Sequence, residues 1–199
     1  MRLLAAIGAL AIVIGIGAAT YFFGGYYSVA GTQEDPALVS WALVKVRTAS
    51  IERHAKDVPS TAFNDPGAVQ AGAKAFAKHG CANCHGAPGV AWQKFSEGMH
   101  PEAPDLKELV GTRSPGQLFW VIKNGINMTG MPAFSLAGAK DDEIWTIAAF
   151  LKKLPTVSEA DYKSWTAPPP PPAPVAAPAP PAAAPEPPAA PAAPPAESK

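Results

Sequence analysis

The sequence lacks most of the motifs that mark enzymes. Its 199 residues hold only two cysteines and four histidines, and the formal net charge is zero. It contains no G-x-S-x-G nucleophile motif, no P-loop and no dinucleotide-binding glycine motif. A neutral chain also offers no basic surface for nucleic acid. We therefore predict a protein without catalytic residues and without a nucleic-acid partner.

Charged residues are absent from the first long stretch of the chain, residues 3–23, and only Arg2 precedes it. A helix of these 21 residues would be roughly 31 Å long, which is the thickness of a bilayer core. Residues 1–30 are therefore predicted to be a transmembrane anchor. A cleaved signal peptide is the alternative, because Ser28-Val29-Ala30 resembles a small-x-small cleavage site. Both hypotheses place the remainder of the chain outside the cytoplasm.

Large apolar side chains are almost absent from the other end of the chain. From residue 167 onwards the sequence is nearly all Pro and Ala, and it holds 15 of the 24 prolines. Proline has no backbone donor, and such a composition cannot build a core. We predict a disordered, semi-extended Pro/Ala-rich tail over residues 156–199. A segment that docks to a partner is the alternative.

The middle of the chain is divided by composition into two parts. Residues 31–64 are predicted to form a juxtamembrane helix, from Asp35-Pro36 to about Ala55, followed by a linker over residues 58–64. Residues 65–155 are predicted to form the compact domain. A domain of only about 90 residues has a small core and commonly needs a covalent or bound group for stability.

Both cysteines lie in CANCHG, residues 81–86. A zinc site would need further ligands in a second spaced pair, which the chain lacks. A thioredoxin-like dithiol would need a preceding strand, whereas residues 67–79 are predicted to be helical. Haem attachment uses the whole motif, because Cys81 and Cys84 can form thioethers to one porphyrin and His85 can ligate its iron. One covalently attached haem c is therefore favoured.

A second iron ligand is predicted in GINMTGMPAF, residues 125–134. Met131 lies between Gly130 and Pro132, which favour an irregular turn that can present a thioether sulfur. A methionine is more commonly a filler of the core, but this position in a loop favours ligation of the iron. Met128 is the next candidate.

Other aromatic and imidazole side chains receive less specific predictions. Phe119 and Trp120, in a predicted helix, are expected to pack against the haem. The remaining histidines, His54, His79 and His100, are expected at the surface.

Four segments, in this order, resemble blocks of the class I c-type cytochromes: GAKAFAKHGCANCHG, APDL, GINMTGMPAF and DDEIWTIAAFLKKL. The resemblance covers roughly residues 65–155. It implies an all-α fold, with a few helices around one covalent haem. Taken with the two ends, the predicted architecture is an N-terminal transmembrane helix, a small cytochrome c fold and a disordered tail.

The resemblance also implies two contacts. The first helix of the domain would cross the last one, with Gly72 and Phe76 close to Ile147 and Phe150. The carbonyl of Pro104 would accept the Nδ1 hydrogen of His85 and so fix the tautomer of the imidazole.

The predicted function is that of a single-electron carrier and not of an enzyme. It would lie on the periplasmic side of a bacterial inner membrane, between a dehydrogenase or quinol-oxidising complex and an oxidase or soluble acceptor. The expected partners are the membrane and redox proteins, and a subunit of a larger respiratory complex fits the same interpretation. One alternative is a haem sensor or enzyme with an open sixth site for a gas or peroxide. Another is a docking protein that acts through its tail.

Overall fold

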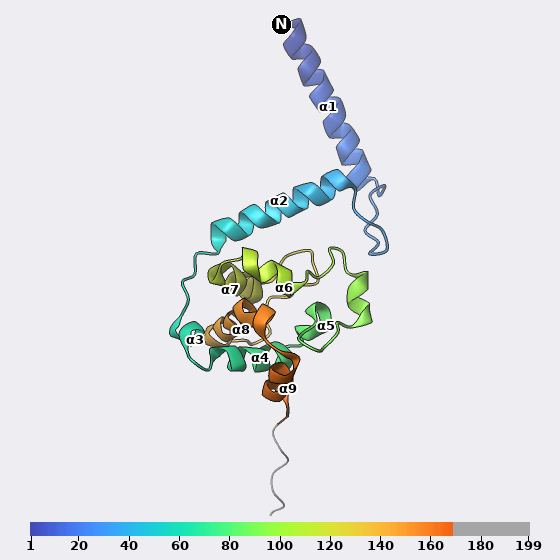
Figure 1. The fold of residues 1–199 in the computed structure, drawn as a ribbon. Helices are drawn as coiled ribbons and strands as arrows, with labels where there is room; N and C mark the ends of the chain where they lie inside the picture. The colour runs from blue at the N-terminus through green and yellow to red at the C-terminus, as the bar shows by residue number, and fades with distance from the viewer. Residues whose placement is uncertain (169–199) are drawn as a thin grey trace, which may run out of the picture. The chain divides into compact units, whose positions relative to one another are not determined.

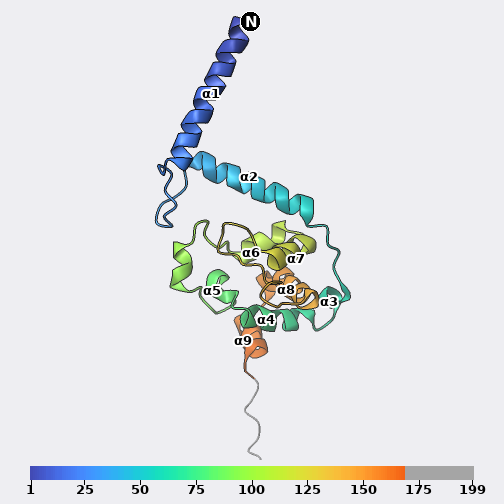
Figure 2. The same cartoon turned by 180° about the vertical axis from the view of Figure 1, so that it is seen from behind.

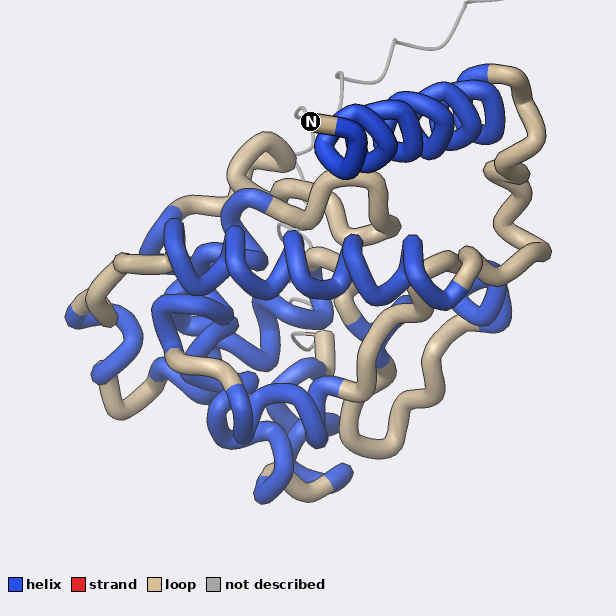
Figure 3. The backbone as a smooth tube through the Cα atoms, turned by 90° about the horizontal axis from the view of Figure 1, so that it is seen from above, coloured by secondary structure: helices blue, strands red, loops and turns tan. Residues whose placement is uncertain are grey.

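Helices and loops build the part of the chain that the structure describes. The computed structural model describes residues 1–168, and over this range it contains no β-strand, only an isolated bridge between Ala87 and Val90 (Figure 3). The predicted all-α fold is confirmed for these residues. The prediction of a disordered tail falls largely on residues 169–199, which lie outside the described residues.

Helix α1 spans Arg2–Phe23, as the uncharged run predicted. All of its residues are exposed. Within residues 1–168 it is the one helix that is long and apolar enough to cross a membrane. A signal sequence near the N-terminus would pass the same test, so the anchor and the signal peptide both remain open.

Helix α8, Asp141–Lys153, lies at the centre of the domain, between α4 (Ala68–Lys78) and α7 (Pro115–Asn124) (Figures 1 and 2). Its acidic first turn and basic last turn complement the helix dipole. Asp141 is the first helical residue, and its carboxylate pairs with Lys123 of α7 at 2.8 Å. The buried side chains of α8 form the middle of the core: Ile144, Trp145, Ile147, Ala148, Ala149, Phe150 and Leu151.

Helices α4 and α8 cross in direct backbone contact, as the resemblance implied. A β-carbon on Gly72 would lie on the carbonyl oxygen of Thr146 and 2.8 Å from the β-carbon of Phe150. One turn further along α4, the ring of Phe76 packs on Phe150 with centroids 5.4 Å apart. Only glycine allows this approach, so the crossing point is set at residue 72.

Helix α7 begins with a capping box. The Ser114 hydroxyl accepts a hydrogen bond from the Gln117 amide at 3.1 Å, and the Gln117 side chain accepts one from the Ser114 amide at 3.0 Å. Phe119 is buried and stacks on Trp145 at 4.1 Å between centroids. Trp120 stacks instead on His54 at 6.1 Å. Neither Phe119 nor Trp120 lines the cavity beside His85, so packing of these two rings against a haem stays a prediction.

Two helices precede the domain core. Helix α2, Ala37–His54, packs on α7 near its C-terminal end, where Ile51 is buried. The segment expected to be a linker contains the short helix α3, Thr61–Asn64, which packs on α8. Phe63 explains this difference, because its ring contacts Trp145 edge-on at 6.0 Å.

Helix α9, Glu159–Thr166, lies in the region that was assigned to the tail. Ser158 caps it by accepting a hydrogen bond from the Asp161 amide at 3.0 Å. Its Tyr162 is buried and stacks on Phe150 with centroids 5.9 Å apart. Ordered packing therefore continues past residue 155, because α9 covers one side of α4 and the end of α8 (Figure 1).

The remaining helical turns are short: α5 (Ala82–His85), α6 (Leu106–Leu109), η1 (Lys94–Gly98), η2 (Val110–Thr112) and η3 (Leu154–Thr156).

Candidate haem site

The cysteine motif forms a tight turn directly after α4. Gly80 (φ 70°) ends that helix and Gly86 (φ 66°) ends the next turn, and both adopt a left-handed conformation that favours glycine. Between them, α5 carries Cys84 and His85, while Cys81 occupies its cap position. The two glycines thus confine all three predicted site residues to one helical turn.

The two cysteines are free, partly buried thiols. Neither Cys81 nor Cys84 is in a disulfide. Burial, with a smaller effect of neighbouring Cys84, raises the pKa of the Cys81 thiol to about 12. Within residues 1–168 there is also no group of three or more His, Cys, Asp or Glu residues arranged for a metal ion.

His85 is held in one orientation by the backbone. Its Nδ1 atom lies 3.0 Å from the carbonyl oxygen of Pro104, and a carbonyl can only accept a hydrogen bond. Nδ1 therefore carries the hydrogen and Nε2 keeps its lone pair. Burial lowers the pKa of His85, although the bond to Pro104 acts in the opposite direction. The neutral imidazole is thus favoured, which is the form that can ligate iron.

A cavity of about 450 Å³ opens beside this turn. Cys84 and His85 form part of its wall, and the segment around Pro104 faces them. The rest of the lining is mostly apolar, with charged groups from Glu102, Asp105 and Lys107. A pocket lined by a cysteine, an imidazole with a free nitrogen and both apolar and charged side chains is chemically suited to a haem. Its further lining residues include Ala87, Val90, Trp92, Ser96 and Leu154.

The methionine loop, residues 125–134, folds back on the end of α7. The Ile126 amide donates to the Met131 carbonyl at 3.1 Å, and the Met131 amide donates to the Thr129 hydroxyl at 3.1 Å. Gly125 (φ 66°) allows this close return, since a β-carbon there would lie 2.6 Å from the carbonyl carbon of Pro132. The loop is therefore built to hold position 131 in place.

The two candidate methionines of this loop differ in environment. Met131 is partly buried and packs against the core. Met128 is 88% exposed. The cavity that holds His85 is lined by residues other than Met131, so ligation by Met131 stays a prediction.

Two residues contact the site in ways that were not predicted from the sequence. The sulfur of Met99 occupies the position that a β-carbon on Gly130 would take, so Met99 covers the methionine loop. The side chain of His79, predicted to be at the surface, is only 12% exposed and contacts Phe134 edge-on with centroids 5.5 Å apart. Neither contact has a sequence signal, because each joins residues about 30 or more positions apart.

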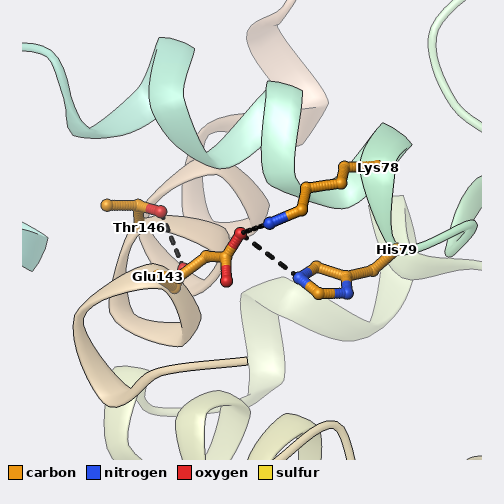
Figure 4. Close-up of polar contacts among 4 residues, drawn as sticks. All are labelled: Lys78, His79, Glu143 and Thr146. Atoms are coloured by element: carbon orange, nitrogen blue, oxygen red, sulfur yellow. Dashed lines mark hydrogen bonds and ion pairs between the residues drawn. The ribbon is translucent and has the colours of Figure 1, made fainter. Parts of the chain in front are cut away.

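Glu143 of α8 contacts the two residues at the end of α4, just before the cysteine turn. Its carboxylate accepts a hydrogen bond from Lys78 at 2.8 Å and lies 3.3 Å from Nε2 of His79 (Figure 4). The Lys78 hydrogen bond, with a smaller effect of His79, lowers the pKa of Glu143. His79 is two residues before Cys81, so this cluster links α4, α8 and the start of the haem-attachment motif.

The comparison with protein families supports a c-type cytochrome domain in the middle of the chain. Residues 67–151 match the protein family described as cytochrome C oxidase, cbb3-type, subunit III. No curated protein and no solved structure matches the chain. The family match supports haem-based electron transfer by this domain, and it ends before α9.

Proposed function

We propose that this chain is a membrane-tethered electron carrier with one haem c. Cys81 and Cys84 would attach the haem covalently, and His85 and Met131 would ligate its iron. The observation that carries the proposal is the His85 imidazole, which lines the cavity beside Cys84 with Nδ1 bonded to Pro104 at 3.0 Å. A haem with His/Met ligation takes up and releases single electrons at a raised potential. The residues of the chain would hold the group, orient the imidazole and exclude water, and no catalytic residue is needed.

The partners would be redox proteins at the same membrane. The matched family is named as a subunit of an oxidase, which supports a place in a respiratory complex. With α1 as anchor, the haem domain would lie on the periplasmic side of a bacterial inner membrane. Electrons would come from a dehydrogenase or quinol-oxidising complex and pass to an oxidase or a soluble acceptor through a small, transient interface.

The visible spectrum of the purified chain tests this proposal. We expect a six-coordinate, low-spin haem in the reduced protein and no binding of carbon monoxide. Met131→Ala should open the sixth site and allow carbon monoxide to bind. Met128→Ala is the matched control and should leave the spectrum unchanged, because that side chain is 88% exposed. Ready carbon monoxide binding by the unsubstituted protein would favour the sensor or enzyme instead.

Cell fractionation tests the anchor separately. An uncleaved α1 should keep the protein in the membrane pellet after an alkaline carbonate wash. A mature protein that is soluble and begins near Gly31 would identify residues 1–30 as a signal peptide. That result would leave the haem proposal intact.

A further inference from the structure

The first half of α2, residues 37–46, is apolar and open to solvent. Within it, only Ser40 and Lys45 have polar side chains. Successive residues of a helix are separated by about 100° around its axis, so the apolar side chains lie on all sides and not on one face. Five of the six largest are exposed: Leu38 (75%), Trp41 (59%), Leu43 (52%), Val44 (42%) and Val46 (67%). The sixth, Val39, is partly buried.

The second half of α2 is different in composition and attaches the helix to the haem domain. Residues 47–54 are mostly polar or charged. Ile51 is buried, and His54 stacks on Trp120 of α7. Just after the helix, the carbonyl of Asp57 occupies the place of a β-carbon on Gly116. The domain therefore holds α2 by its C-terminal end, and the apolar half is left without a partner within residues 1–168.

The distribution of apolar side chains indicates what covers this half. A protein surface that docks on a helix covers one side of it, and the opposite side would stay exposed. A lipid phase surrounds whatever enters it, so it can cover side chains on every side. A helix that is apolar all round is typical of a buried or membrane environment.

The neighbouring sequence points to lipid as well. Only 13 residues separate α1 from α2, so the start of α2 lies within about 47 Å of the end of α1 even if the link is fully extended. Exposed Tyr26 in that link and Trp41 in α2 are aromatic residues of the kind enriched at membrane–water interfaces. Basic side chains lie near the end of the apolar half, at Lys45, and after it, at Arg47 and Arg53, where they can meet anionic headgroups.

We propose that residues 37–46 of α2 lie in the lipid–water interface of the membrane that α1 would span. This inference rests on the proposed membrane tether. Because the other end of α2 is fixed to α7, the α7 side of the haem domain would face the membrane. Helix α9 packs on α4, on the far side of α8 from α7, and would face away from it (Figures 1 and 2).

Spin labelling of the full-length haem protein tests this placement. With Cys81 and Cys84 in thioethers, one introduced cysteine is the only free thiol. Nitroxide labels are placed at Leu38→Cys and Leu43→Cys, which lie about 140° apart around the helix. Glu52→Cys, in the polar half, is the matched control, and Ile12→Cys reports on α1. The protein is reconstituted in phosphatidylcholine–phosphatidylglycerol vesicles, and collisions with oxygen and with a water-soluble nickel chelate are measured by electron paramagnetic resonance.

We expect the ratio of oxygen to nickel collisions to be several-fold higher at positions 38 and 43 than at position 52. Nickel access at either position equal to that at 52 would overturn the proposal. Spin–spin broadening at 38 or 43 would overturn it in favour of a second copy of the chain.

The label at position 12 shows independently whether α1 spans the bilayer. The protein without an introduced cysteine should take no label. If this protein did take up label, Cys81 or Cys84 would be a free thiol. That result would refute thioether attachment of the haem but would not bear on the placement of α2.

Discussion

Gly72 is the residue at which the two largest helices of the domain meet. A methyl group at this position would overlap the Thr146 carbonyl and crowd Phe150, so Gly72→Ala must push α4 and α8 apart. Overpacking of this kind costs about 1–3 kcal/mol, and each kcal/mol lowers the melting temperature of a domain this size by roughly 4–8 °C. The measurement is thermal unfolding of the haem-loaded protein. Gly111→Ala is the control, since no atom lies within 4 Å of its β-carbon position, and equal melting temperatures would contradict the tight crossing.

Glu143 is the residue that should give stability a dependence on pH. Its pKa is lowered in the folded protein, so the stabilisation is present above the unfolded pKa, about 4.3, and is lost as pH falls through the lower folded value. Its partners are partly exposed, so the contribution is about 0.2–1 kcal/mol. Glu143→Gln should therefore unfold more easily than the unsubstituted protein at pH 5–7, and the difference should shrink below about pH 4.3 and vanish once the pH is below the lowered pKa of the folded protein. Denaturant unfolding at several pH values measures it, and a difference independent of pH would contradict the ion-pair explanation.

Residues in local motifs could be predicted from the sequence, whereas residues defined by packing could not. The cysteine turn and its flanking glycines are contiguous, so their conformation could be read from a few neighbouring positions. The His85–Pro104 contact spans 19 residues and was available only through the family resemblance. The burial of His79 and the orientation of Trp120 depend on partners from other helices. No pattern of spacing or propensity encodes such contacts.

At the scale of elements, the dependence on packing also explains why the domain was predicted to end at residue 155, before α9. Periodicity and caps indicated α4, α7 and α8, because each carries a long apolar stripe or a capping signal. Helix α9 has only 8 residues and lies between a proline and the Pro/Ala-rich segment. The cap at Ser158 is local, but the burial of Tyr162 arises only from Phe150 and α4.

Helix α9 should therefore contribute to the stability of the haem domain. Loss of a buried aromatic side chain costs about 3–5 kcal/mol, so Tyr162→Ala should lower the melting temperature markedly. A chain ending at Val157 should behave in the same way. A chain ending at Ala167 keeps α9 and should unfold like the full-length protein. If all three chains unfolded at one temperature, α9 would be a passive extension.

At the scale of the whole molecule, the helices of residues 1–168 are arranged in layers around α8. Helix α8 forms the centre, α7 and α2 lie on one side, and α4 and α9 lie on the other. The cavity with His85 opens beside the cysteine turn at the end of α4. One continuous unit, residues 1–167, thus combines the helix proposed to lie at the membrane, the core and the proposed haem site.

The haem site should also couple binding to folding. The cavity of about 450 Å³ reaches Leu154, which belongs to the core, so an empty site would leave apolar walls without contacts beside that core. A group that binds only the folded state stabilises it. Without such a group, a domain this small has a low free energy of unfolding. We expect the double variant Cys81→Ser/Cys84→Ser, which cannot attach haem, to lose cooperative unfolding. Near-ultraviolet circular dichroism of the full-length protein on heating measures this.

Two comparisons separate this coupling from a simple effect of substitution. Cys84→Ser alone should keep one thioether site and hold its haem weakly, with a melting temperature below that of the unsubstituted protein. Met128→Ala changes an exposed side chain and should unfold normally. A double cysteine variant that melts cooperatively at the temperature of the haem-loaded protein would mean that the helices alone are sufficient for the fold. We expect the double variant to lose cooperative unfolding because of the position of the cavity. A haem bound there would contact the core as well as its own ligands.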